Sequence, residues 1–122
     1  DRIEDQLEPL SDDHDHTHID ETGITSVSLT CDAPLDPALL EEWVQDLLAR
    51  QGANILRTKG VLSIVEEDRK LVLQAVNMML EGDYVGSWET EIRQSRLVFI
   101  GRNLKFDDLN TGLQNCRPVV AA

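Results

Sequence analysis

Apolar and polar residues follow two different periods in the first folded part of this sequence. In "ITSVSLTC" they alternate from Ile24 onward, and the β-branched residues of that stretch favour a strand. Between Asp36 and Gly52 the apolar residues recur every three or four positions, which predicts an amphipathic helix. Its apolar stripe consists of Leu40, Trp43, Val44, Leu47 and Leu48. Asp36 is suited to cap this helix, Pro37 to occupy its first position, and Gly52 to follow its end.

The rest of the chain predicts further strands and a second, shorter helix. The extended stretches are "NILRTKGVLSIVEE", interrupted near Lys59 and Gly60, "LVLQAVNMML", "EGDYVGSW" and "SRLVFIG". "EGDYVGSW" continues or reverses the run before it, and Gly82 and Gly86 are the expected bend or bulge points. The stretch "NLKFDDLNTGLQNC" predicts a helix that begins near Asp107 or Asp108.

The connections between the predicted strands decide the fold class. They are too short to allow crossovers, so neighbouring strands should pair antiparallel. The sequence therefore predicts an α+β fold, a two-layer sandwich of a mainly antiparallel sheet of four or five strands with two helices on one face. We expect three parts: residues 1–22 as an acidic linker, 23–117 as the folded domain and 118–122 as a tail.

The net charge of the chain argues against two classes of binding partner. The chain has 23 acidic and 11 basic residues, a net charge of −12, which argues against nucleic acid and anionic membranes as partners. Residues 1–22 hold nine acids and one base, so this short segment alone contributes −8. The longest apolar runs are too short for a membrane span, and the N-terminus lacks the features of a signal peptide. We expect the protein in the cytoplasm, with an organelle as the alternative.

The stretch "DDHDHTHID", residues 12–20, contains every histidine of the chain. Imidazole nitrogens bind zinc, nickel, cobalt and copper, and neighbouring carboxylates can complete a site. The candidate metal ligands are His14, His16, His18, Asp13 and Asp15, and Asp20 lies within reach. We expect weak, exchangeable binding of a divalent transition metal, zinc first and cobalt second, because a segment without packing must be ordered on binding. The alternative is an acidic spacer with incidental histidines.

The other residues that could take part in chemistry are expected to have structural roles. The chain contains no GxxxxGK[ST], GxSxG, HExxH or GxGxxG motif, so it is not expected to be an enzyme by itself. Cys31 and Cys116 lack metal-site spacing and are expected to be reduced, packed thiols. We expect Lys59 and Gly60 at a bulge with a solvated lysine; the alternatives are a close backbone approach and a contact with a partner. The pair Met78 and Met79 is predicted to fill the core, and Trp88 to cover a sheet edge.

Three stretches in order along the chain point to a family. "ILRTKGVLSI", "LVLQAVNMMLEGDYVGSW" and above all "SRLVFIGRNL" resemble the C-terminal domain of CobW-type GTPases, and the resemblance runs from about residue 1 to 117. The His-rich and Asp-rich tract is similar to the linker that such proteins carry. The family's chemistry lies in an N-terminal P-loop domain with a CxCC metal motif, and neither motif is present here. "DRIEDQLEPL" resembles the segment where that domain ends.

The resemblance implies an accessory domain of a GTP-hydrolysing metallochaperone, with GTP bound only by the absent domain. The implied partners are the N-terminal GTPase domain of the same protein and a client metalloprotein, and a homo-oligomer stays open. Zinc delivery and cobalt insertion in cobalamin synthesis are the two activities known in the family. The alternative from another class is a protein-interaction or dimerisation module whose histidines bind nothing.

Overall fold

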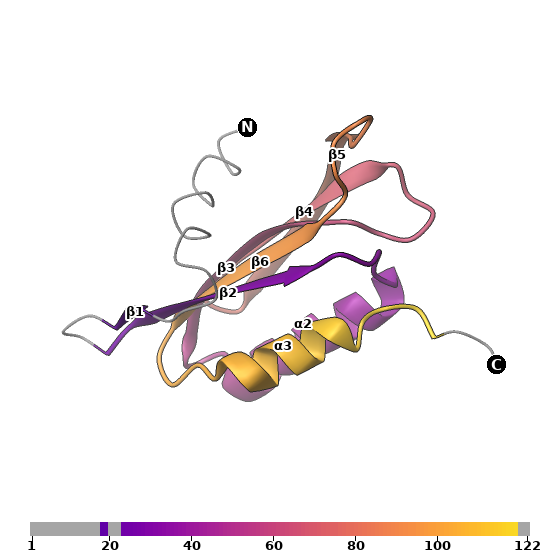
Figure 1. The fold of residues 1–122 in the computed structure, drawn as a ribbon. Helices are drawn as coiled ribbons and strands as arrows, with labels where there is room; N and C mark the ends of the chain where they lie inside the picture. The colour runs from indigo at the N-terminus through magenta and orange to yellow at the C-terminus, as the bar shows by residue number, and fades with distance from the viewer. Residues whose placement is uncertain (1–17, 20–22, 120–122) are drawn as a thin grey trace.

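The computed structural model describes residues 18–19 and 23–119, which form one sheet with two helices against one of its faces (Figure 1). In chain order the elements are β1 (His18–Ile19), β2 (Thr25–Cys31), α2 (Pro37–Gln51), β3 (Ile55–Leu62), β4 (Arg69–Val76), β5 (Met79–Ser87), β6 (Ser95–Gly101) and α3 (Phe106–Gln114). The strand order is β1-β2-β6-β3-β4-β5, and all neighbouring strands are antiparallel. Five long strands and one two-residue edge strand therefore confirm the predicted two-layer α+β sandwich.

Helix α2 forms where its local signals predict it. The Asp36 side chain accepts hydrogen bonds from the backbone N–H groups of Ala38 (2.8 Å) and Leu39 (3.2 Å), and proline follows it at the first helical position. The residues that α2 buries against the sheet are Leu40, Val44, Leu47 and Leu48. Each such side chain contributes about 1.5–3 kcal/mol when it is fully removed from water. The apolar stripe thus fixes α2 on one face of the sheet.

Strand β3 continues without interruption through Lys59 and Gly60, so the expected bulge there is wrong. Gly60 pairs with Leu73 on one side and with Leu97 on the other in regular register. A Cβ atom at Gly60 would lie 2.5 Å from the carbonyl oxygen of Arg96 and 2.6 Å from Cδ1 of Leu97. The glycine is needed because the backbone of β6 at Arg96 and the Leu97 side chain occupy the space beside it, which is the close backbone approach considered as an alternative. The irregularity in β3 lies earlier, between Ile55 and Arg57.

The run of residues 71–80 is not one strand but the two arms of a hairpin. The chain reverses at Asn77, whose φ of 56° is left-handed and whose N–H donates to the carbonyl of Leu56 (3.0 Å). Met78 and Met79 are 59% and 76% exposed, so the prediction that they fill the core is wrong. The reason is the reversal itself, because it places both methionines at the tip of the hairpin, where Met78 only touches the end of α2 at Gly52.

Gly86 occupies the second irregularity of the sheet. Arg69 pairs with Ser87 and Lys70 with Val85, so Gly86 has no partner residue on β4. The predicted bulge is confirmed at this glycine. Gly82, the other expected irregularity, pairs with Leu73 in regular register. The bulge turns the end of β5 just before Trp88.

The two faces of the sheet differ in what covers them. Helices α2 and α3 lie side by side on one face, as Figure 1 shows, and the main core is between them and the sheet. Its fully buried strand residues include Val27, Leu29, Ile55, Leu62, Leu97 and Phe99. The other face, called the open face below, has no described helix on it. It contains a second apolar cluster of Val61, Val98 and Trp88, with Val72 and Ile100 beside it.

Trp88 belongs to that second cluster, so the expectation that it covers a sheet edge is wrong. It is only 5% exposed and packs with Val61 of β3 and Val98 of β6, two inner strands. The bulge at Gly86 precedes it, and its backbone N–H donates to the carbonyl of Asp68 (3.0 Å). These contacts turn the indole over the open face.

Candidate functional site

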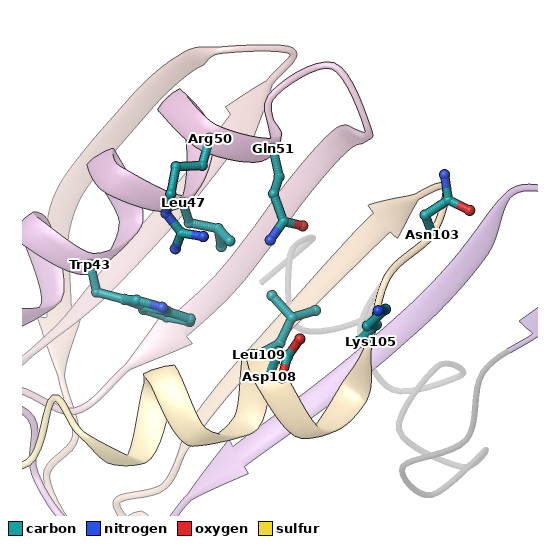
Figure 2. A pocket seen from close by; sticks show the side chains of 8 residues that line it. All are labelled: Trp43, Leu47, Arg50, Gln51, Asn103, Lys105, Asp108 and Leu109. Carbon is teal, nitrogen blue, oxygen red and sulfur yellow. The ribbon is translucent and has the colours of Figure 1, made fainter.

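A cavity of about 330 Å³ lies between the C-terminal half of α2 and the start of α3 (Figure 2). Its lining residues are Trp43, Leu47, Arg50 and Gln51 from α2, and Asn103, Lys105, Asp108 and Leu109 from the turn after β6 and from α3. The apolar side chains form its floor because they continue the stripe that packs α2 on the sheet. The charged and amide groups come from the ends of the helices and surround the opening. The cavity is therefore a by-product of how the two helices meet.

Trp43 sets the width of this cavity. Its ring meets Phe99 edge to face, with centroids 6.1 Å apart and planes at 84°. Gly112 of α3 lies directly beneath the indole, and a Cβ there would collide with Nε1 of Trp43. Arg50 is held at the rim by an ion pair with Asp46 (2.8 Å) one helical turn earlier. A glycine and an aromatic pair thus bring the helices close enough to enclose the space.

The rim of the cavity is polar and carries charges of both signs. Its rim offers the cations of Arg50 and Lys105, the amides of Gln51 and Asn103, and the carboxylate of Asp108. The lining residues within the described ranges include no histidine, cysteine, serine or threonine. Such a surface can hold a side chain or a small polar molecule.

A second, shallower hollow of about 430 Å³ lies on the open face over β4 and β5. Its lining residues are Val72, Gln74, Glu81, Gly82 and Asp83. Glu81 and Asp83 are two positions apart on one strand, so they share a face. They are the acids among the strand residues of the open face, and a metal site normally needs three or four ligands. Within the described part of the chain, histidine, cysteine, aspartate and glutamate form no group of three that could hold a metal ion.

The two cysteines are free and buried, as predicted. The Cys31 thiol donates to the side-chain oxygen of Gln114 (3.4 Å), and the Cys116 thiol to the carbonyl of Gly112 (3.3 Å). Burial raises the pKa of Cys116 to about 11, and the electrostatic effects of the neighbouring Cys31 and Asp36 raise it further. A thiol with this pKa stays protonated at neutral pH. It is therefore a poor nucleophile and a poor metal ligand.

Cationic groups surround Trp88 on the open face. The Lys70 ammonium lies 5.5 Å from the centroid of the indole ring and pairs with Glu91 (2.9 Å). The Arg93 guanidinium carbon lies 5.9 Å from the same centroid. Arg93 also donates to Ser63 Oγ (3.1 Å) and to the carbonyls of Ile64 (3.0 Å) and Glu67 (2.6 Å). Arg93 was not among the residues that the sequence singled out, because its partners, one hydroxyl and two backbone carbonyls, lie far away along the chain.

Most of the predicted metal ligands lie outside the described residues. The structure places the backbone of His18 in β1, opposite Ser26 of β2. His14, His16, Asp13 and Asp15 lie outside the ranges that the structure describes, as does Asp20.

Among residues 18–19 and 23–119, no helix is long and apolar enough to cross a membrane.

A match to a known family shows which family this domain belongs to. A family model described as the cobalamin synthesis protein cobW C-terminal domain matches residues 24–117, most of the chain. This chain belongs to the CobW C-terminal domain family. The predicted membership is confirmed, and the matched residues run from the start of β2 to just beyond α3.

Other members of known function and structure are similar to this CobW-family chain. The zinc chaperone YjiA of Escherichia coli (strain K12) is 28% identical over 97 residues, covering 80% of this chain and 30% of YjiA. Two crystal structures are similar to this chain, each with a TM-score of 0.75 and 28% sequence identity. Each match covers 79% of this chain and 30% of the chain in the crystal structure. They are the Zn(II)-bound YjiA GTPase from E. coli and a Zn(II)-bound triple mutant of that GTPase. The chain therefore spans about 30% of the length of the relatives it matches.

Proposed function

We propose that this CobW-family domain is the accessory part of a GTP-hydrolysing metallochaperone, and that its histidine tract binds zinc for delivery to a client protein. Membership of the family and similarity to a protein named zinc chaperone support the parent activity. The observation that carries the metal proposal is the concentration of all three histidines in residues 12–20. GTP hydrolysis belongs to the GTPase domain of the parent. This domain contacts that GTPase domain, the client protein, or both.

The proposed ligands are His14, His16 and His18, assisted by Asp13 and Asp15. Neutral imidazole and carboxylate are both good zinc ligands, and the five groups lie within six consecutive residues. The backbone of His18, the last of these ligands along the chain, pairs with Ser26 of β2. We propose weak, exchangeable binding, because all the ligands come from one short acidic stretch that has few apolar residues to order it. A carrier that passes metal on needs such a site.

Zinc titration of the 122-residue chain tests the proposal. We expect the wild-type chain to take up zinc in the micromolar range or weaker, and a variant with His14→Ala, His16→Ala and His18→Ala to lose most of that uptake. Binding should also weaken below about pH 6, because protonated imidazole cannot bind metal. Equal uptake by the wild type and the triple variant would refute the proposed ligands.

A matched pair of charge variants separates ligation from general attraction of cations. Asp13→Asn with Asp15→Asn removes two charges from the tract, and Asp107→Asn with Asp108→Asn removes two charges from the start of α3. The first pair should weaken zinc binding more than the second. If both pairs weaken it equally, the tract attracts zinc only through its charge.

A further inference from the structure

Strand β5 is the free edge of the sheet along its whole length. It lies last in the strand order, and among the described strands it pairs only with β4. Alternate residues of an antiparallel edge strand direct their N–H and C=O groups away from the sheet. Met79 and Val85, at the two ends of the regular part of β5, are 76% and 42% exposed, and residues 81–83 between them are exposed as well. The outer side of β5 is therefore open to another strand.

β5 lacks most of the features that protect an edge strand from pairing. Edge strands that stay unpaired are usually short, carry lysine or proline, or are bent by a bulge. Residues 79–87 contain no proline and no basic residue. Residues 79–85 pair with β4 in unbroken register, and the bulge comes only after them, at Gly86. This regular part is longer than the usual strand of about five or six residues, so it can pair fully with a further strand.

Two carboxylates give this edge a specific charge. Glu81 and Asp83 lie two positions apart on the open face and line the hollow of about 430 Å³ over β4 and β5. Within residues 23–119, neither side chain takes part in a hydrogen bond or an ion pair. The pKa of the Arg69 guanidinium is raised chiefly by its hydrogen bond with Glu67 (2.9 Å), and the charge of Asp83 contributes least. Both carboxylates are thus available to a cation from outside the domain.

The bases of the open face lie on other strands than these acids. Among its strand residues the bases belong to the inner strands β3, β4 and β6, and they are Arg57, Lys59, Lys70 and Arg96. Gln74 separates Lys59 from Glu81, because Lys59 pairs with Gln74 and Gln74 pairs with Glu81. The open face is therefore basic over the inner strands and acidic at its β5 edge. A partner that meets the edge first should carry positive charge.

The side chains of β5 on the open face define what a neighbouring strand should present. In chain order they are apolar, acidic, acidic and apolar, contributed by Met79, Glu81, Asp83 and Val85. Directly opposite pairs on two strands are favourable between opposite charges and between apolar residues, and unfavourable between like charges. A complementary strand therefore carries two bases that are two positions apart, with an apolar residue two positions beyond each of them.

A second copy of the chain does not supply such a strand. If two β5 strands paired antiparallel around Gly82, each Glu81 would lie opposite an Asp83 of the other copy, which is unfavourable. The sequence has one pair of bases that are two positions apart, Arg57 and Lys59. They lie in β3, which is already paired on both sides by β4 and β6. The complementary strand must therefore come from outside these 122 residues.

We propose that the outer edge of β5 is a docking site for an extended basic segment of a partner protein. The segment adds to the sheet as a further strand and extends its basic side chains over the hollow to Glu81 and Asp83. Backbone hydrogen bonds along the edge hold the segment, and the two carboxylates select its charge and register. This site deepens the proposed contact of the domain with another polypeptide, and to that extent rests on the proposed function. It does not involve the histidine tract.

Titration of the 122-residue chain with a synthetic peptide tests the site. The peptide Val-Thr-Lys-Thr-Lys-Thr-Val, with blocked ends, can place its lysines opposite Glu81 and Asp83 and its valines opposite Met79 and Val85. When the peptide is bound, the outward-pointing amides of β5 should exchange their hydrogens severalfold more slowly, as measured by NMR. A control peptide of the same composition, Val-Thr-Lys-Lys-Thr-Thr-Val, has its lysines on opposite faces and should bind severalfold more weakly. Unchanged exchange of the β5 amides with the first peptide, or equal binding of the two peptides, would overturn the proposal.

A matched pair of charge variants tests the role of the two carboxylates. Glu81→Gln with Asp83→Asn removes both charges at nearly constant shape and should weaken binding of the first peptide severalfold. Glu41→Gln with Glu42→Gln removes as much charge from exposed positions of α2 and should leave the binding unchanged. If both pairs weaken the binding equally, the peptide responds only to the net charge of the chain, and the proposed site is wrong.

Two N-methylated peptides separate strand addition from attraction between side chains. Methyl groups on alternate backbone nitrogens block hydrogen bonding along one edge of an extended peptide and leave the other edge intact. The first peptide is therefore made in two forms, methylated on its odd or on its even residues. One form should bind like the unmethylated peptide and the other severalfold more weakly, because only one edge can pair with β5. Equal binding of both forms would exclude strand addition.

A second copy of the chain is the competing occupant of the edge, and dilution distinguishes it. Without peptide, the outward-pointing β5 amides should exchange at the same rate in concentrated and in dilute solution. Protection that is present only in the concentrated solution would mean that another copy occupies the edge, which contradicts the proposal. A chain with His14→Ala, His16→Ala and His18→Ala should bind the peptide as the wild type does, so failure of zinc binding and failure of peptide docking remain distinguishable.

Discussion

Gly60 is the position where the sheet leaves the least room for a side chain. A Cβ there would lie 2.5 Å from the backbone carbonyl oxygen of Arg96 and 2.6 Å from Cδ1 of Leu97. The leucine side chain can rotate, but the carbonyl belongs to β6, which is paired with strands on both sides. Gly60→Ala should therefore destabilise the domain. In an ordinary strand the same change would add stability, because alanine loses less backbone entropy than glycine.

The expected size follows from how little the neighbours can move. Overpacking a core costs about 1–3 kcal/mol, and a clash with fixed backbone belongs at the upper end. For a domain of this size each kcal/mol lowers the melting temperature by about 4–8 °C, so a loss of about 3 kcal/mol predicts a fall of about 12 °C or more. Urea denaturation and thermal melting of the 122-residue chain, followed by circular dichroism, measure both quantities.

Two further variants isolate the cause. Gly86→Ala places a methyl group where nothing lies within 4 Å, so its stability should stay within about 0.5 kcal/mol of the wild type. Leu97→Val shortens one of the two clashing neighbours, so its effect combined with Gly60→Ala should be smaller than the sum of the single effects. A Gly60→Ala protein that melts at or above the wild-type temperature would refute the close-approach argument.

Two other predictions concern α2 and the thiol beside it. Asp36→Ala removes the acceptor of two N–H groups at the start of α2 and should lower the free energy of unfolding by about 1 kcal/mol in urea denaturation. Asp36→Asn should keep most of the wild-type stability, because its side-chain oxygen can still accept these hydrogen bonds. The pKa of Cys116 rises from 9.0 to about 11 on folding, so between these pH values the unfolded chain loses a proton that the folded chain keeps. Stability should then fall with rising pH by up to about 1.4 kcal/mol per pH unit in that window, and Cys116→Ala should remove this part of the slope in urea denaturation at pH 8 to 11. An unchanged slope in that variant would contradict the buried thiol as its source.

Helix α2 could be predicted almost completely because its signals are local. The cap at Asp36, the proline after it and the apolar stripe all act within one helix, and the structure reproduces them. The fold class was equally accessible, since the short connections leave little choice but antiparallel pairing. The hairpin at Asn77 was missed because an apolar run crosses the turn without a glycine or proline to mark it.

What the sequence could not predict depends on residues that are distant along the chain. Gly60 suggested a bulge, and only the position of Leu97 on the neighbouring strand explains it. Arg93 gave no signal because it bonds to backbone carbonyls of a loop between β3 and β4. The basic, apolar open face arises only when β6 lies between β2 and β3, since that order brings Arg96 and Val98 next to Val61 and Lys59. The candidate metal ligands, by contrast, were found from composition alone and stay a prediction.

The position of β6 also determines when this domain can fold during synthesis. β2 and β3 touch the same strand rather than each other, and that strand is made last. Until residues 95–101 have left the ribosome, β2 and the β3–β4–β5 meander lack the strand that pairs with both, and each has an unpaired strand edge. Such edges pair readily with other chains, and contacts between distant residues form slowly. The nascent polypeptide thus passes through an aggregation-prone interval that ends only when its final strand is inserted.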